Sequence, residues 1–285
     1  MMNNTPTVRI QKIRKNRTRT MLIVFGILAA ALLVCSVIAP LLCPYDPYAQ
    51  DLSKSLQPPS AEHWLGTDRY GRDLLSRIII GSQTSIYSTL LLVAVMTVVG
   101  TVLGVIAGLY GGIIDTIIMR ISDIFLAFPG LVFALAVAGA LGGGVQNAII
   151  ALAAVGWPKF ARLARSQTLA QKKQQYMDAA KISGDGMFHI IIWHLMPNII
   201  GPIIVTAVLD IGTSMMEIAG LSYLGLGAMP PVAEWGSMMS GAREFIQTAP
   251  WVAFGPGIAI FISVVIFNML GDTVRDYFDP RQRTK

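Results

Sequence analysis

Charged residues are scarce in this sequence. Asp, Glu, Lys and Arg make up 13% of the 285 residues, whereas hydrophobic residues make up 54%. Soluble proteins carry about 25% charged residues, so this balance predicts a membrane protein. Cysteine is equally scarce, because only Cys35 and Cys43 occur, in or at the end of the first apolar run. Neither a disulfide framework nor a cysteine zinc site is indicated.

Several catalytic motifs are also missing. No stretch matches the phosphate-binding loop G-x-x-x-x-G-K-[ST], and no glycine is followed by lysine, so the chain lacks a P-loop ATPase site. The motifs G-x-S-x-G and H-E-x-x-H are absent as well. His189 and His194 are five residues apart, which is about 140° around an α-helix and unsuited to shared metal ligation. We expect no catalytic residue, no cofactor and no metal site.

Long uncharged runs separate the basic segments. Residues 21–43 follow six Lys or Arg and are long enough for a membrane span, which takes roughly 20 residues. A signal peptide would have a shorter apolar core, of about 7–15 residues. Residues 128–130 should bend the third span, and the glycines at 142–144 should form a tight external turn. Further spans are expected at 78–114, from about 115, from 145 to 157, at 198–229 and at 245–271.

These runs predict an all-α membrane protein with six transmembrane helices and both termini in the cytoplasm. The net charge of +6 reflects basic residues that border apolar spans, as the positive-inside rule predicts, and no nucleic-acid partner is expected. Gly100, Gly104 and Gly108 recur every four residues and should allow close helix packing inside the chain. Arg120 and Asp123 are three residues apart and should be able to pair on one helix face.

The longest well-charged segment between two apolar runs is 159–197, which should face the cytoplasm. It contains, at fixed spacing, Asp178, Ala179, Ala180, Gly184 and Pro197. This pattern resembles the E-A-A-x-x-x-G loop of ABC importer permeases, although Asp178 replaces Glu. In that family the loop forms a short coupling helix that sits in a groove of the ATPase subunit. Small alanines permit close approach, and a glycine can adopt the turn that ends the helix. The alternative is an ordinary amphipathic cytoplasmic loop.

Residues 44–77 are polar and rich in proline, and we expect them outside the membrane. This segment resembles the LGTDxxGRDxxSR signature of the peptide and nickel branch of ABC permeases. The matching residues are Gly66, Thr67, Asp68, Gly71, Arg72, Asp73 and Arg77. Aspartate and arginine in such a loop can pair locally, and we expect a structural role for any single residue alongside a family role.

Two further stretches, 221–227 and 267–280, extend the resemblance over nearly the whole chain. Together the four stretches look like the second permease subunit of dipeptide, oligopeptide and nickel ABC importers. The resemblance implies a type I importer permease fold in the bacterial cytoplasmic (inner) membrane. It also implies a heterodimer with a homologous permease, two cytoplasmic ATP-binding subunits that hydrolyse ATP, and an extracytoplasmic substrate-binding protein. Residues 1–80 would hold the first helix and external loop, and 81–285 the permease domain.

Two acids, Asp210 and Glu217, lie in the fifth apolar run on nearly the same helix face. An acid at the centre of a membrane helix costs roughly 2.5–3.5 kcal/mol, so they should line the translocation path or the partner interface, or hydrogen-bond to neighbouring helices. An acidic lining suits a cationic cargo, either nickel, as an ion or chelate, or a peptide. Glu217 resembles an acid of the peptide branch, whereas the stretch 209–212 looks more like the nickel branch, and this resemblance narrowly favours nickel. The alternative function is a proton-coupled secondary transporter that uses both acids as its relay.

Overall fold

The computed structural model describes residues 6–278, with side chains from residue 18 onward. This part of the chain is helical and forms no strand beyond an isolated bridge between Thr67 and Asp73, which confirms the predicted all-α class. The long helices are α1 (Pro6–Val37), α3 (Leu74–Tyr110), α6 (Val145–Gln171), α9 (Met196–Tyr223) and α11 (Trp251–Phe278). The shorter α-helices are α2 (Ala39–Leu42), α4 (Gly112–Leu126), α5 (Gly130–Ala140), α7 (Gln175–Ile182), α8 (Met187–His189) and α10 (Trp235–Ala242). A π-helix, η2 (Ile190–Leu195), and two 3₁₀ turns, η1 (Leu52–Lys54) and η3 (Arg243–Phe245), complete the described elements.

Among the described residues, four helical segments are long and apolar enough to cross a membrane. They are Thr18–Val37, Leu74–Tyr110, Met187–Tyr223 and Trp251–Phe278. Helices α4 and α5 are bent by 91° at their junction and together could make a fifth span. Helix α6 has 27 residues, but its second half is basic. The structure therefore supports a multi-pass helical protein, while the count of six spans stays a prediction.

The predicted breaks lie where the sequence placed them. Pro129 immediately precedes α5 at the bend, and Gly142, Gly143 and Gly144 all have positive φ in the turn before α6. The last span differs, because the helix begins at Trp251 and not near 245. The predicted basic loop also begins later than residue 159, since α6 remains helical to Gln171.

Helices α3 and α6 pack along the glycine face predicted from the sequence. A methyl group added at Gly104 would lie 2.2 Å from the carbonyl oxygen of Ala161, and one at Gly100 would lie 2.5 Å from that of Trp157. A methyl group added at Gly108 would lie 2.7 Å from Cβ of Thr168. These three glycines therefore serve packing within the chain, as predicted. The largest apolar core surrounds this contact and includes Leu92, Met96, Leu152, Phe160, Ile199 and Ile218.

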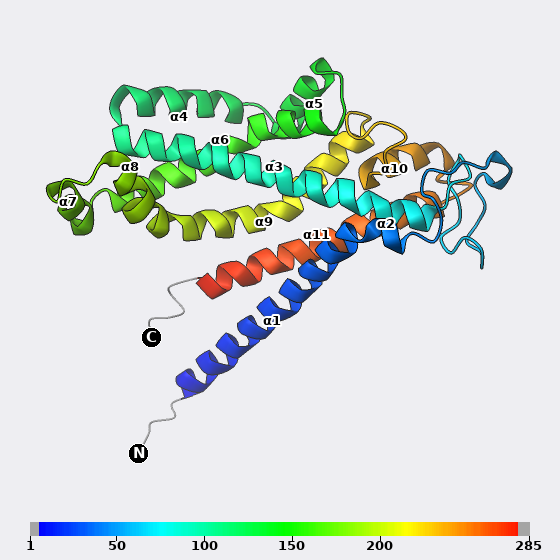
Figure 1. Cartoon of the computed structure of the whole chain (residues 1–285), viewed down its shortest axis with the longest axis horizontal. Coiled ribbons are helices and arrows are strands. Elements are labelled where there is room, and N and C mark those ends of the chain that lie inside the picture. Colours follow the sequence, from blue (N-terminus) through cyan, green and yellow to red (C-terminus); the bar gives the residue numbers. More distant parts are fainter. Residues whose placement is uncertain (1–5, 279–285) are drawn as a thin grey trace.

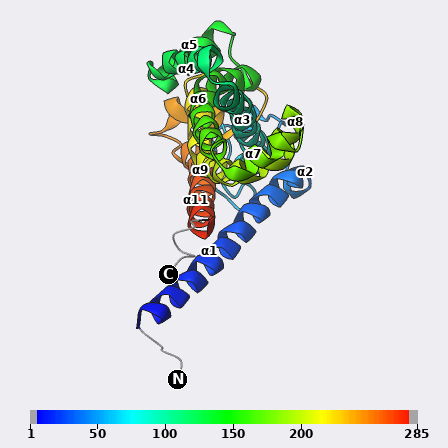
Figure 2. The same cartoon turned by 90° about the vertical axis from the view of Figure 1, so that its left-hand side faces the viewer.

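A second set of contacts joins α9 to α11. Gly212 faces Asn268, whose side-chain oxygen lies 2.0 Å from the position of an added methyl group, and Gly271 faces Leu209 in the same way. Helix α1 packs mainly on α11, and its span is largely exposed. Seen from the end that holds α7, α1 leans away from the other helices (Figure 2).

The two ends of the molecule carry different segments. Helix α7 lies at the same end as the start of α1 and the end of α11, whereas α10 and the loop after α2 lie at the opposite end (Figure 1). This arrangement agrees with the predicted topology, in which both termini share a side with the basic loop. The expected tail after 278, including Asp279 and Pro280, lies outside the described residues.

The predicted pairing of Arg120 with Asp123 is wrong. Asp123 instead accepts a hydrogen bond from Arg162 of α6, at 2.7 Å, and Arg165 binds Asp115 of α4. The reason is tertiary, because α4 lies beside α6 and brings distant charges together (Figure 1).

Substituting Gly104 with alanine should destabilise the protein, because the added methyl group meets the α6 backbone at 2.2 Å. Overpacking of this kind costs on the order of 1–3 kcal/mol. Thermal unfolding of the purified chain in detergent measures the loss. Gly139→Ala is the matched control, since nothing lies within 4 Å of its added methyl group and alanine favours helix. Equal unfolding temperatures for the two variants would contradict the packing role.

Candidate functional site

Helix α7 is an eight-residue helix that contains the predicted coupling residues. Asp178 lies in its first turn and Lys181 in its last, which complements the helix dipole, and the two side chains pair at 3.1 Å. Gly184 follows in a left-handed conformation with φ of +83°. Its N–H bonds the carbonyl of Lys181, and the next N–H bonds that of Ala180. These bonds form a Schellman motif, so Gly184 ends the helix as the sequence predicted.

One face of α7 packs on the chain itself. Met177 and Ala180 are buried against Ile190 of the π-helix. The small side chain of Ala180 therefore permits close packing inside this subunit, and the contact of this loop with an ATPase subunit stays a prediction. Ala179 and Asp178 are exposed.

The exposed face of this region is apolar as well. Ile182 is 87% exposed and Phe188 is 78% exposed, and Met187 and Trp193 are exposed beside them. Sequence reasoning missed these residues, because it concentrated on the motif positions. Their signal was present as large apolar residues within an otherwise polar loop. Such a patch is typical of a protein or membrane contact surface.

The π-helix η2 connects this region to α9. Ile190 and Leu195 are five residues apart and both buried, which fits the i→i+5 repeat of a π-helix. Pro197 lies in the first turn of α9, directly after the π-helix. The same repeat brings His189 and His194 together, with ring centroids 5.8 Å apart. The predicted separation of about 140° is wrong because it assumed an α-helix.

Asp210 and Glu217 both lie on α9. Asp210 is buried and accepts a hydrogen bond from Nζ of Lys159, an α6 residue, at 2.5 Å. Glu217 is partly buried, and within the described part of the chain no hydrogen bond or ion pair reaches it. It lies close enough to Asp210 and Lys159 to interact with both charges. The sequence predicted an acidic pair, whereas the structure shows two acids and one base.

The loop at the opposite end is organised around two buried aspartates. Asp68 binds the guanidinium of Arg72 at 2.7 Å and accepts hydrogen bonds from two backbone N–H groups. Arg77 lies 3.6 Å from the same carboxylate and donates to the carbonyl of Pro47. All three charged side chains are buried, and the Asp68 carboxylate lies between the two arginines, which leaves one net positive charge that the Pro47 carbonyl helps to solvate.

Asp73 caps the start of α3. Its carboxylate accepts hydrogen bonds from the N–H and hydroxyl of Ser76, and its other oxygen lies 2.9 Å from Nδ1 of His63. Thr67 is fully buried; its hydroxyl donates a hydrogen bond to the carbonyl of Lys54 in η1 and accepts one from the N–H of Gln57. Gly66 and Gly71 have positive φ, and a methyl group at Gly71 would lie 1.7 Å from a backbone oxygen. The motif residues thus hold the loop and the start of α3 in place.

Helix α10 is fixed to α3 at this same end. Glu234 caps α10 by accepting hydrogen bonds from the N–H groups of Gly236 and Ser237. Burial raises the pKa of the Glu234 carboxyl above its usual value, although those two hydrogen bonds act in the opposite direction. The hydroxyl of Ser85 in α3 donates a hydrogen bond to the Glu234 carboxylate and accepts one from the backbone N–H of Trp235. A pocket of about 340 Å³ opens between α10 and the loop, lined by Arg69, Tyr70, Arg72, Met229, Val232 and Ser237, among others.

Two family models match the sequence. The model described as binding-protein-dependent transport system inner membrane component matches residues 100–284. The chain belongs to this family. The model for the N-terminal TM domain of oligopeptide transport permease C matches residues 11–59, which places the chain in the peptide and nickel branch of ABC importer permeases.

Curated relatives of this permease align over most of their length. The probable D,D-dipeptide transport system permease of Escherichia coli K12 is 43% identical over 90% of this chain and 86% of its own. The dipeptide transport system permease of Alkalihalophilus pseudofirmus is 43% identical over 96% and 89%. The nickel transport system permease of Escherichia coli K12 is 40% identical over 85% and 87%.

A solved structure of the MetNI methionine ABC transporter has the same fold. It superposes with a TM-score of 0.58 at 18% identity, covering 72% of this chain and 98% of the other. The likeness supports the predicted type I importer permease fold, and with the family match it identifies a multi-pass inner-membrane permease.

Replacing Asp73 of this permease with alanine should destabilise it strongly, because the change removes the α3 cap and the buried partner of His63. Loss of a helix cap alone costs about 0.5–2 kcal/mol of stability. Buried His63 would also lose its hydrogen-bond partner, which adds to this cost. Asp51→Ala is the control, since Asp51 caps only the short, exposed η1 turn. Thermal unfolding should show a larger loss for Asp73→Ala; equal losses would refute a role for Asp73 beyond an ordinary cap.

Proposed function

We propose that the chain is the permease subunit of an ATP-driven importer that carries small peptides across the cytoplasmic membrane. It would pair with a homologous permease, receive cargo from an extracytoplasmic binding protein, and couple to two cytoplasmic ATP-binding subunits. The observation that carries this proposal is α7, a short capped helix at one end of the molecule with an exposed apolar patch. The chain matches a family of binding-protein-dependent permeases and has no P-loop motif. Both observations support a role in which partner subunits, and not this chain, hydrolyse ATP.

Helix α7 is suited to transmit motion from an ATPase. Ile182 and Phe188 offer an exposed apolar surface to a partner, while Met177 and Ala180 anchor the helix to the π-helix that leads directly into α9. A displacement of α7 would therefore reach α9, the helix that carries Asp210 and Glu217. Coupling by this route needs α7 to stay short and rigid, which the glycine cap ensures.

Gly184→Val should abolish ATP-driven uptake while leaving the protein in the membrane. Space around Gly184 is open, so the obstacle is the backbone alone, because valine opposes a φ of +83°. Gly186→Val is the matched control: its surroundings are equally open, but its φ is −68°. Uptake by proteoliposomes that contain the whole transporter gives the comparison. Equal uptake by the two variants would refute a role for the Gly184 turn.

The Lys159, Asp210 and Glu217 group would form the polar part of the translocation path or of the interface with the partner permease. Lys159 is about half exposed in this chain, so its charged end is available to a second subunit or to cargo. An unpaired acid such as Glu217 is costly in lipid and should face protein or water. The group offers both signs of charge, with one net negative charge.

This mixed charge fits a zwitterionic peptide, whose amino and carboxyl groups could each find an opposite charge. Relatives named for D,D-dipeptide, dipeptide and glutathione transport support a peptide cargo. Nickel is the second candidate, supported by the nickel permease relative and by the stretch 209–212. The Lys159 contact weakens the argument for a cation, because that argument assumed two uncompensated acids. A proton-coupled secondary transporter is not favoured, since the family match is to ABC permeases.

Glu217→Gln should lower peptide uptake without lowering assembly, because it keeps the shape and removes the unpaired charge. Asp210→Asn should have a larger effect, since it also leaves the Lys159 ammonium without its ion-pair partner, and Lys159→Met added to Asp210→Asn should restore part of the loss. Uptake of labelled dipeptide and of ⁶³Ni²⁺, measured in the same vesicles with the cognate binding protein, separates the two cargoes.

The matched control for these variants is Asp272→Asn, an exposed acid near the end of α11. It should leave uptake at the wild-type rate. Normal uptake of both cargoes by Asp210→Asn and Glu217→Gln would mean that neither charge serves the path. Copurification of an ATP-binding subunit with the chain tests the wider assembly.

A further inference from the structure

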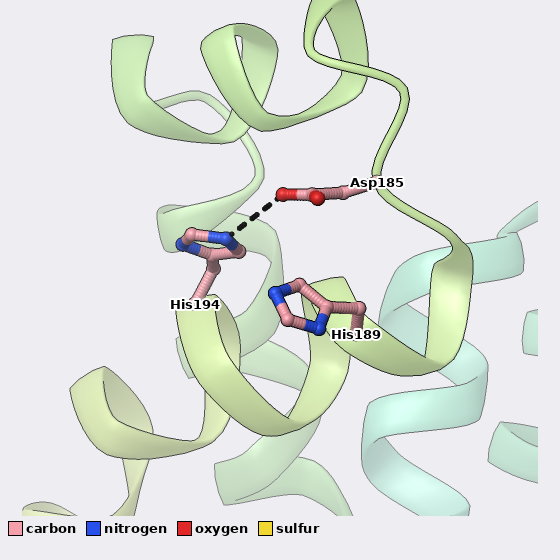
Figure 3. A group of neighbouring side chains, drawn as sticks. All are labelled: Asp185, His189 and His194. Carbon is pink, nitrogen blue, oxygen red and sulfur yellow. Dashed lines mark hydrogen bonds and ion pairs between the residues drawn. The ribbon is translucent and has the colours of Figure 1, made fainter.

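Three potential metal ligands meet where the loop after α7 returns to the π-helix. Asp185, His189 and His194 each offer one ligand atom, and these atoms all lie within 4.8 Å of one another (Figure 3). His194 Nε2 is already 3.1 Å from a carboxylate oxygen of Asp185. The described residues contain no other such group of three.

The π-helix creates this arrangement. In an α-helix, residues five apart point in different directions, but the wider π turn places them nearly one above the other. Buried Ile190 and Leu195 fix the register from the inner side. His189 and His194 are consequently held on one outer face, opposite Asp185 (Figure 3).

The distances suit a metal ion after a small closure. Ligand atoms around a tetrahedral ion with bonds of about 2.0–2.1 Å lie roughly 3.3 Å apart. Asp185 and His194 already meet that spacing, so only His189 must approach. Its side chain is exposed and free to do so. The hydrogen bond between Asp185 and His194 could serve loop structure alone. That role would not require the imidazole of His189 to lie beside the same two side chains.

We propose that Asp185, His189 and His194 bind a divalent first-row transition metal ion such as Zn²⁺, Ni²⁺ or Co²⁺. Two imidazole nitrogens and one carboxylate oxygen favour these ions over Mg²⁺ and Ca²⁺, which prefer all-oxygen sites, and over Cu(I), which prefers sulfur. The partly exposed position leaves room for water as a further ligand.

Bound metal would tie the end of α7 to the turn that leads into α9. Asp185 is the residue whose N–H completes the Schellman cap of α7, and His194 lies two residues before α9 begins. A metal ion here would restrict movement of α7 relative to α9 and so stiffen the route by which a displacement of α7 would reach α9. This regulatory consequence depends on the proposed coupling function, whereas metal binding itself does not.

Co²⁺ titration of the purified full-length chain in lipid nanodiscs tests the site, with visible absorption as the readout and an affinity tag that lacks histidine. One equivalent should bind, and Zn²⁺ should displace it. Loss of a partner that only orients a ligand costs 10–100-fold in affinity, so Asp185→Asn, His189→Ala and His194→Ala should each weaken binding by at least about tenfold. Size-exclusion chromatography shows whether each variant remains folded.

Two controls exclude other sources of binding. Asp178→Asn removes the neighbouring carboxylate, which pairs with Lys181 outside the cluster, and should leave the dissociation constant unchanged. The double variant Asp210→Asn with Glu217→Gln removes the acids of the candidate path and should also bind normally. Equal affinity in wild type and in a triple variant that combines Asp185→Asn, His189→Ala and His194→Ala, or loss of binding only in the path variant, would overturn the proposal. A failed coupling function would leave the Co²⁺ spectrum intact, so the two proposals fail separately.

Discussion

The close approach of α3 to α6 is the contact on which the rest of the structure depends. It is possible because Gly100 and Gly104 let the two backbones meet without an intervening side chain. One end of this pair begins at Asp73, where the buried loop network holds α3, and the other end continues from α6 into α7. The loop that holds Asp68 and Asp73 and the helix α7 are therefore attached to opposite ends of the same packed unit. A shift at one end has a rigid route to the other.

The basic face of α6 organises the remaining charges. Lys159, Arg162 and Arg165 occupy one helix, while their partners lie on α9 and α4. Each contact joins residues about 40–50 positions apart, so no local pattern could have revealed it. This is why the sequence could identify Asp210 as an expensive charge but not name Lys159 as its partner, and why a local pairing of Arg120 with Asp123 was expected instead.

Apolar runs, the Pro129 bend, the glycine turn at 142–144 and the Gly184 cap were all predictable, because each follows from backbone chemistry or from local composition. The π-helix was not, since its register depends on burying both Ile190 and Leu195 against other elements. Tertiary packing also limited the prediction for α7. The sequence motif indicated a small side chain at Ala180, but only the structure shows that this side chain packs on Ile190.

The external signature shows why family motifs cannot specify the cargo. Asp68, Arg72, Asp73 and Arg77 direct their charges at one another, at His63 or at the backbone. Residues committed to such a network are unavailable to a transported molecule, and they would be required equally for a peptide or a metal ion. Under the proposed function, discrimination would rest on groups whose charges are not fully used within the chain. In the described residues Glu217, with the partly exposed Lys159, meets that condition, and the binding protein could add selectivity before cargo reaches them.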